Sequence, residues 1–343
     1  MPNIKFEFQR WVGQQLGTHE LILEPLTGDA SFRSYFRVRA GKASYILMVA
    51  PPTKERTDIF VNLARAWKEK GLPVPAILGW EPDQGLVLLS DFGDVLLSQV
   101  LNDETADPFY QTAMQHLLLL QTQIPITDLP VFSEAHIRLE LSYFKEWFLD
   151  KLLGIQITAE INQLLEQVND CLITNLLSQP QVAIHRDYHS RNLMVLNTQG
   201  QLGIIDFQDA MVGPITYDLV SIFKDCYIDW SQNKVHRWAK WFFDKLIENK
   251  SLLPMDFSSF LGWFDFAGLQ RHLKVLGIFS RLKLRDNKPN YLADMPRIMN
   301  YVLPVTQHYA AFAEFDAFLR SEVMIPLQKI WQEQNINTVV KVA

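Results

Sequence analysis

This sequence of 343 residues contains few cysteines and no long apolar runs, and it has no excess of positive charge. Its two cysteines, Cys171 and Cys226, are too few for a disulfide scaffold and form no C-x-x-C pair. No run approaches the length of a transmembrane helix, and charges within residues 1–10 argue against a secretory signal. The net charge of −6 argues against a general nucleic-acid binder. We therefore expect a cytoplasmic protein with no membrane or nucleic-acid partner.

The sequence is rich in apolar residues, at 48%, which is enough to build a sizeable core. Within the first ninety residues, period-two alternation and turn residues predict strands, and one stretch has the apolar spacing of a helix. The expected strands are 21–26, 34–39, 44–49, 76–80 and 85–90, with the helix at 58–70 after the third strand. This order is typical of the small lobe of a kinase, although other α+β domains share it.

From about residue 107 the pattern becomes mostly helical. The expected helices are 107–122, 133–153, 158–177, 216–229, 234–249, 258–284 and 291–318. A hairpin interrupts them, with strands 192–196 and 202–206 joined by the turn Asn197-Thr198-Gln199-Gly200. We place the lobe boundary between residues 90 and 91.

The strongest chemical signal is the segment 185–193, which matches the kinase catalytic loop H-x-D-x-x-x-x-N with Asp187 and Asn192 at the defining positions. Asp206 follows 14 residues after Asn192, at the end of the predicted hairpin. Because the hairpin folds back, Asn192 and Asp206 should lie side by side and offer oxygen ligands to Mg²⁺. Asp187 would then accept the proton of an acceptor hydroxyl.

Two plainer interpretations compete with this one. Asp187, Asn192 and Asp206 could each be turn residues beside a hairpin, but their joint spacing favours catalysis. His185 and His189 have the H-x-x-x-H spacing of some zinc sites. They occupy a loop rather than one face of a helix, so we expect His185 to pack against the loop instead.

The catalytic segments 185–192 and 206–209 resemble those of aminoglycoside phosphotransferases and choline kinases. Segments 28–37, 206–225 and 269–282 are similar to one branch, the bacterial N-acetylmuramate/N-acetylglucosamine anomeric kinases. The resemblance implies a two-lobed, protein-kinase-like α+β fold. Residues 1–90 would form a small antiparallel β-sheet lobe that binds the nucleotide, and residues 91–343 a larger, mainly helical catalytic lobe. It also implies ATP-dependent, Mg²⁺-dependent phosphorylation of the C1 hydroxyl of an amino sugar in cell-wall recycling.

The expected phosphate-covering loop lies between the first two predicted strands. Gly28, Ala30 and Ser31 are small, so backbone N–H groups there could approach phosphates. Arg33 could add a charge-assisted hydrogen bond. An ordinary hairpin carrying a surface arginine is the competing interpretation.

The other expected nucleotide contacts are less regular. Ser90 and Phe92 lie in a segment that resembles the adenine-binding hinge. Met48 stands where the third strand of a kinase normally carries a phosphate-binding lysine, and a methionine cannot replace a cation. Either Arg33 or another basic group substitutes, or the chain is a weak or inactive kinase. Asp218 lies at a predicted helix start, where we expect it to cap N–H groups and support the catalytic loop.

The acceptor site is the least defined part of the prediction. Arg191 lies inside the catalytic loop and Asp209 follows the metal aspartate, so both are substrate candidates. Arg271, His272 and Lys274 begin a basic stretch that either is a solvated helix face or supplies a cation for the carboxylate of N-acetylmuramate. A kinase for an aminoglycoside, choline or a similar amine, and a nucleotide-binding pseudokinase, remain the alternatives.

Overall fold

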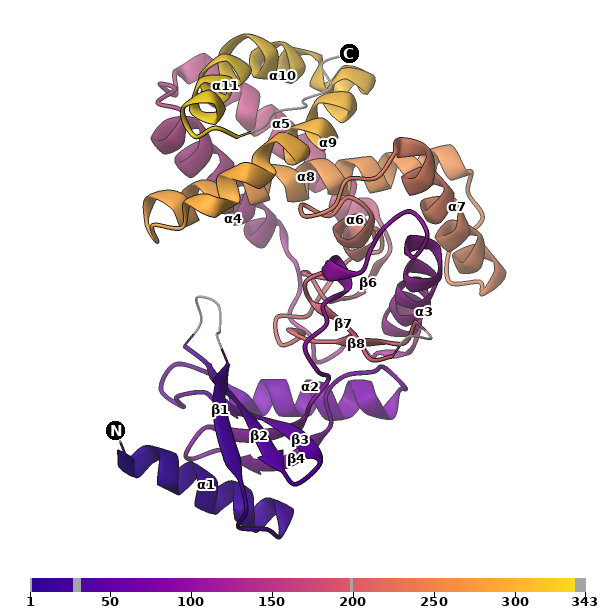
Figure 1. Ribbon diagram of the computed structural model, residues 1–343. Helices are drawn as coiled ribbons and strands as arrows, with labels where there is room; N and C mark the ends of the chain where they lie inside the picture. Colours follow the sequence, from indigo (N-terminus) through magenta and orange to yellow (C-terminus); the bar gives the residue numbers. More distant parts are fainter. Residues whose placement is uncertain (1, 27–31, 198–199, 337–343) are drawn as a thin grey trace. The chain divides into compact units, whose positions relative to one another are not determined.

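The structure is a computed structural model that describes residues 2–26, 32–197 and 200–336. It divides into two compact units (Figure 1). The first unit contains Met1–Ile124 and Arg191–Asp209, and the second contains Pro125–Ser190 and Ala210–Ala343. The lobe boundary between residues 90 and 91 stays a prediction. No helix within the described part of the chain is both long and apolar enough to cross a membrane.

The first unit is organised around a five-stranded antiparallel sheet. Its order is β1 (Ile22–Leu26), β2 (Ser34–Ala40), β3 (Ala43–Val49), β5 (Leu86–Ser90) and β4 (Ile77–Glu81). All five predicted strands are therefore confirmed. Residues of one face alternate with residues of the other, as the pleat of a strand requires.

Helices cover this sheet, as Figure 1 shows for α1 (Pro2–Leu16) and α2 (Thr57–Glu69). Val12 of α1 packs with Leu23, Leu47 and Leu88 on one face of the sheet. Helix α1 was not predicted from the sequence. The unit is completed by η1 (Leu97–Gln99), α3 (Ala106–Gln123) and a second small sheet of β7 (Leu193–Val195) and β8 (Leu202–Ile204).

The second unit is built around one helix of 28 residues, α8 (Phe257–Leu284). Figure 1 shows α8 running through the unit among other helices. Those that contact it include α4 (Glu134–Tyr143), the π-helix η2 (Phe144–Leu152), α5 (Ala159–Ser178), α6 (Tyr217–Phe223), α7 (Gln232–Glu248), η3 (Pro289–Asp294) and α9 (Met295–His308). Gly277 of α8 lies so close to the backbone of Tyr143 that a β-carbon would overlap it.

Some helix predictions are confirmed and others are corrected. The helix expected at 133–153 changes from α4 into the π-helix η2, and the one expected at 216–229 ends at Phe223. The one expected at 291–318 is interrupted at Tyr309, whose extended backbone separates α9 from the short helices η4 (Ala310–Phe312) and α10 (Ala313–Phe318). The strand pair β6 (Gln181–Ile184) and β9 (Met211–Pro214), the π-helix η5 (Leu319–Val323) and the helix α11 (Met324–Glu333) were not predicted.

Candidate active site

In the first unit, the hairpin β7–β8 brings Asn192 and Asp206 together. Leu193 pairs with Ile204, and the Ile205 N–H donates to the Asn192 carbonyl at 3.1 Å. The Asn192 amide lies 3.5 Å from Oδ2 of Asp206, which is an exposed side chain. An amide and a carboxylate at this separation form a donor set that suits a hard divalent cation.

The residue after Asp206 anchors this segment to α2. Phe207 is fully buried, and its ring lies 4.9 Å from that of Phe60 and 5.3 Å from that of Trp67. Asp206 itself has a φ of 64°, in the left-handed region that non-glycine residues seldom occupy. Such strain persists only where surrounding contacts enforce it, and here the buried ring of Phe207 supplies them. The sequence analysis assigned no role to Phe207.

The phosphate-covering loop is only partly described. Gly28, Ala30 and Ser31 lie outside the described residues. Arg33 donates to Oε2 of Glu55 through Nε at 3.1 Å and Nη2 at 2.9 Å. Although burial opposes the charge, this carboxylate helps to raise the pKa of Arg33, so the guanidinium stays charged. A phosphate contact by Arg33 stays a prediction.

Met48 is fully buried in β3, where it pairs with Tyr35 of β2 and Val87 of β5. Its thioether is therefore part of the sheet core. That Met48 stands at the position of the third-strand lysine of kinases stays a prediction.

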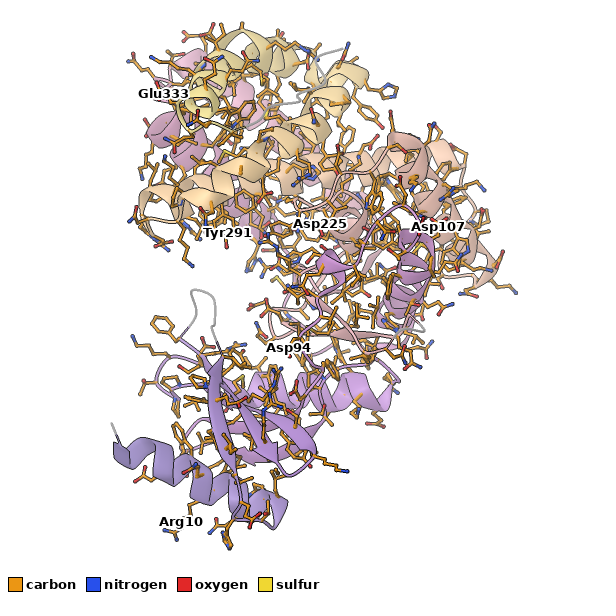
Figure 2. The ribbon with its side chains drawn as sticks, in the orientation of Figure 1. Arg10, Asp94, Asp107, Asp225, Tyr291 and Glu333 are labelled. Carbon is orange, nitrogen blue, oxygen red and sulfur yellow. The ribbon has the colours of Figure 1, made fainter. Side chains whose placement is uncertain are left out.

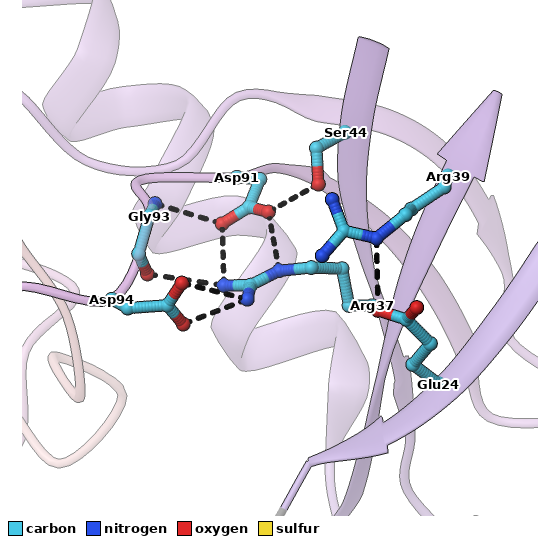
Figure 3. Close-up of polar contacts among 7 residues, drawn as sticks. All are labelled: Glu24, Arg37, Arg39, Ser44, Asp91, Gly93 and Asp94. Atoms are coloured by element: carbon cyan, nitrogen blue, oxygen red, sulfur yellow. Dashed lines mark hydrogen bonds and ion pairs between the residues drawn. The ribbon is translucent and has the colours of Figure 1, made fainter. Parts of the chain in front are cut away.

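The segment that follows β5 is fastened to the sheet by Arg37 of β2 (Figure 3). The Arg37 guanidinium donates to both oxygens of Asp91, to Asp94 and to the Gly93 carbonyl. Ser44 adds a 2.5 Å bond to Asp91. Burial opposes ionisation of Asp91, but these donors outweigh it and lower its pKa. The sequence analysis missed Arg37, whose only signal was a charge within an otherwise half-apolar strand.

The two predicted hinge residues lie within this fastened region. Ser90 ends β5, and its hydroxyl accepts the Ala76 N–H at 2.9 Å. The ring of Phe92 packs so closely over Gly203 of β8 that a β-carbon there would overlap it. Both residues therefore have structural partners, and their contact with adenine stays a prediction.

In the second unit, Asp218 holds the catalytic loop by its backbone. Its carboxylate accepts the N–H groups of His185 at 2.6 Å and Arg186 at 3.0 Å. Arg186 has a φ of 76°, so a second residue of the kinase motif is held in the left-handed region. Full burial nevertheless raises the pKa of Asp218 to about 6. Asp218 thus supports the loop that carries Asp187.

A second carboxylate, that of Asp225 (labelled in Figure 2), holds the end of the same loop. Asp225 accepts the Ser190 N–H at 2.9 Å and the Ser190 hydroxyl at 2.5 Å through the same oxygen. Its other oxygen accepts the Tyr227 N–H at 3.1 Å. Both Asp225 and Ser190 are buried, so these bonds form away from competing water.

Glu140 of α4 joins three elements beneath the loop, and the sequence analysis did not single it out. The side chain is 5% exposed, and it accepts from Arg186 at 2.8 Å and from Gln270 at 3.0 Å. It also forms an ion pair of 2.9 Å with Lys274, whose ammonium donates to the Tyr217 hydroxyl. Although burial opposes ionisation, Lys274 and Arg186 keep the pKa of Glu140 below its usual value.

Asp187 is influenced by several positively charged side chains. Burial disfavours its ionised form, but Lys274, His189 and Arg271 outweigh that effect and hold the pKa of Asp187 well below its usual value. The carboxylate is therefore ionised at neutral pH. An ionised carboxylate can accept a hydrogen bond from an acceptor hydroxyl and orient it.

Residues 22–247 match the phosphotransferase enzyme family. The N-acetylmuramate/N-acetylglucosamine kinase of Pseudomonas aeruginosa PAO1 is 38% identical over 88% of this chain and 88% of its own length. The protein of the same name from Neisseria meningitidis serogroup B is 34% identical, over 92% of this chain and 95% of its own. This chain belongs to the phosphotransferase enzyme family.

Solved structures agree with a phosphotransferase fold. Choline kinase LicA from Streptococcus pneumoniae superposes with a TM-score of 0.61 at 13% identity, covering 89% of this chain and all of its own. Aminoglycoside phosphotransferase APH(4)-Ia, solved with ADP and hygromycin B, superposes with a TM-score of 0.56 at 15% identity. It covers 86% of this chain and 97% of its own. The predicted two-lobed, kinase-like α+β fold class is confirmed, as is the predicted family.

The phosphotransferase chain buries the residues that were expected to be a solvated basic face or a substrate contact. Arg271, His272 and Lys274 are 3%, 1% and 7% exposed, so the solvated-face alternative is wrong for these three. Arg191 and Asp209 are exposed residues of the first unit. A role in acceptor binding stays a prediction for all five.

Proposed function

We propose that this chain transfers the γ-phosphoryl group of ATP to the C1 hydroxyl of N-acetylmuramate and N-acetylglucosamine. The observation that carries the proposal is the 38% identity to the Pseudomonas aeruginosa kinase over 88% of both chains. The match to the family model spans the predicted catalytic residues, since it covers residues 22–247. Choline and aminoglycoside kinases support only the shared fold, because their identity to this chain is 13–15%.

Asp187 is the residue that acts on the acceptor in this proposal. Its carboxylate, kept ionised by Lys274 and Arg271, accepts the proton of the sugar hydroxyl as the new O–P bond forms. The bond between the γ-phosphorus and its bridging oxygen breaks, and ADP leaves with that oxygen. An anomeric hydroxyl is more acidic than an ordinary alcohol, so a weakly basic carboxylate is adequate.

Asn192 and Asp206 would hold a Mg²⁺ ion, whose charge offsets that of the phosphates when it is bound. Their spacing and their oxygen donors are the features that fit this ion. Arg33 is the described residue most suited to an additional phosphate contact, since Met48 offers no charge. Cell-wall sugar recycling in the cytoplasm is the setting that fits these acceptors.

The test is an ADP-release assay with N-acetylmuramate, N-acetylglucosamine, kanamycin and choline as acceptors, with phosphorus NMR of the product. We expect turnover with the two N-acetyl sugars and a sugar 1-phosphate as product. Asp187→Asn should lower kcat by roughly 10²–10⁴-fold. Asp244→Asn is the matched control, because Asp244 is a surface residue paired with Lys240. Wild-type rates in Asp187→Asn would contradict the assignment of the base.

A further inference from the structure

Three basic side chains of α8 are buried beside the catalytic loop, and their partners differ. Lys274 forms an ion pair of 2.9 Å with Glu140, which also pairs with Arg186, and it donates to the Tyr217 hydroxyl at 3.3 Å. Although burial alone would lower it, the Glu140 charge raises the pKa of Lys274. Lys274 therefore already has a carboxylate partner within the protein.

His272 also has a complete structural environment. Its Nε2 lies 3.0 Å from the Lys224 carbonyl, and its ring stacks on Tyr301 with centroids 4.9 Å apart. Burial lowers the pKa of His272 to about 3, so the imidazole is neutral at physiological pH. A neutral, stacked ring is not an anion-binding group.

Arg271 differs from both neighbours, because its guanidinium has only neutral partners. Nε donates to the Ser221 hydroxyl at 2.8 Å, and Nη1 contacts the Cys226 thiol at 3.6 Å. Among the residues that the structure describes, no carboxylate lies within ion-pair distance of it. Nη2 has no partner in that set and is not sealed from solvent. A thiol is a weak acceptor. Although burial opposes the charge, the acidic groups around Arg271, among them Asp187 and Asp225, raise its pKa, so the guanidinium is charged but has no carboxylate hydrogen-bonded to it.

A buried guanidinium without a carboxylate is costly unless a ligand completes it. Arg271 is 3% exposed, yet its charge acts on Asp187, whose pKa it lowers. The hydrogen bonds of Arg271 also place it beside the catalytic loop. Ser221 lies on the same helix as Asp218, and Cys226 follows Asp225, and both of these aspartates hold backbone N–H groups of the loop. The planar fork of arginine suits a carboxylate, which it can bind through two parallel hydrogen bonds.

We infer that Arg271 binds the carboxylate of N-acetylmuramate and so determines the preference of this enzyme for the acidic sugar over the neutral one. This inference rests on the proposed function. N-acetylmuramate differs from N-acetylglucosamine by a lactyl ether that carries one carboxylate, while the C1 hydroxyl is common to both. Arg271 is thus a specificity residue, and Asp187 acts on either sugar.

The experiment compares kcat/KM for N-acetylmuramate, its methyl ester and N-acetylglucosamine in wild type and Arg271→Met. In wild type we expect the methyl ester to lose most of the advantage of the free acid, because it has no charge. In Arg271→Met we expect kcat/KM for N-acetylmuramate to fall by about 30-fold or more, as truncating one partner of a buried charge pair does. N-acetylglucosamine should change by no more than a few-fold, and acid and ester should become equivalent.

Arg285→Met is the matched control, since Arg285 ends the same helix but is exposed and paired with Asp286. Arg271→Lys keeps the charge, should retain part of the preference, and carries the comparison if the methionine variant does not fold. Equal losses for both sugars would overturn the inference in favour of a purely structural arginine, as would an unchanged preference. Failure of wild type to phosphorylate either sugar would instead overturn the proposed function, and this inference with it.

Discussion

Glu140→Gln is the substitution that should most sharply test the buried network beneath the catalytic loop. Glutamine keeps the shape of the side chain and one acceptor oxygen, but removes the charge that faces Arg186 and Lys274 at 2.8 Å and 2.9 Å. Both cations would then be buried with less compensation. Breaking a buried ion pair from one side typically costs about 3–5 kcal/mol. We expect a loss of about 3 kcal/mol in the free energy of unfolding of the second unit.

Urea unfolding followed by tryptophan fluorescence measures this loss. Most of the nine tryptophans lie in the second unit, so the signal reports mainly on that unit. They are Trp147, Trp230, Trp238, Trp241, Trp263 and Trp331. The midpoint should fall while the slope of the transition stays constant, since the same surface becomes exposed.

Glu166→Gln is the matched control for Glu140→Gln, because its carboxylate is 48% exposed and lies 3.4 Å from Arg138. It should change stability by no more than about 1 kcal/mol. Adding Lys274→Met to Glu140→Gln removes one of the stranded cations, so the double variant should be more stable than the sum of the single losses predicts. A loss below about 1 kcal/mol in Glu140→Gln, or strict additivity, would refute the reasoning.

Three further perturbations test other parts of the structure. Lys274→Met removes a cation that lowers the pKa of Asp187, so the pKa of Asp187 should rise. The carboxylate then gains its proton at a higher pH. The acidic limb of the kcat/KM profile should therefore move to higher pH by about 1 pH unit or more. Gly277→Ala should destabilise the second unit by roughly 1–3 kcal/mol, because the methyl group meets the backbone of Tyr143 at the end of α4. Arg37→Met should release Asp91 and raise the KM for ATP more than it lowers kcat, because the segment predicted to bind adenine loses the side chain that holds it.

Each of these has a control on the same element or an outcome that contradicts it. Lys283→Met on α8 should leave the pH profile unchanged, and an unshifted limb in Lys274→Met would contradict the electrostatic account of Asp187. At Gly262 only the Tyr309 hydroxyl lies within 4 Å of an added β-carbon, so Gly262→Ala should leave stability unchanged or increase it. Equal losses of stability at Gly262 and Gly277 would contradict the explanation by close packing. For the hinge, Arg39→Met removes an exposed pair with Glu24 and should not alter the KM for ATP.

The local sequence pattern was sufficient to predict much of the fold and the meeting of Asn192 with Asp206. Alternation, apolar runs and turn residues predicted all five strands of the first sheet, although β5 is buried on both faces. The turn between 196 and 202 predicted that Asn192 and Asp206 would meet, and the hairpin places them 3.5 Å apart. These features depend on residues that are near one another in the chain.

Tertiary structure decided which buried charges balance one another. Glu140 meets Lys274 across 134 positions of sequence, and no local pattern signals such a pairing. The same holds for Arg37 with Asp91, and for Asp225 with Ser190. The sequence could place Arg271, His272 and Lys274 on one helix. It could not show that Lys274 is ion-paired, that His272 is stacked, and that Arg271 has only neutral hydrogen-bond partners. That difference arises because the burial of a charged side chain and its partners depend on which residues of other helices and loops pack against it.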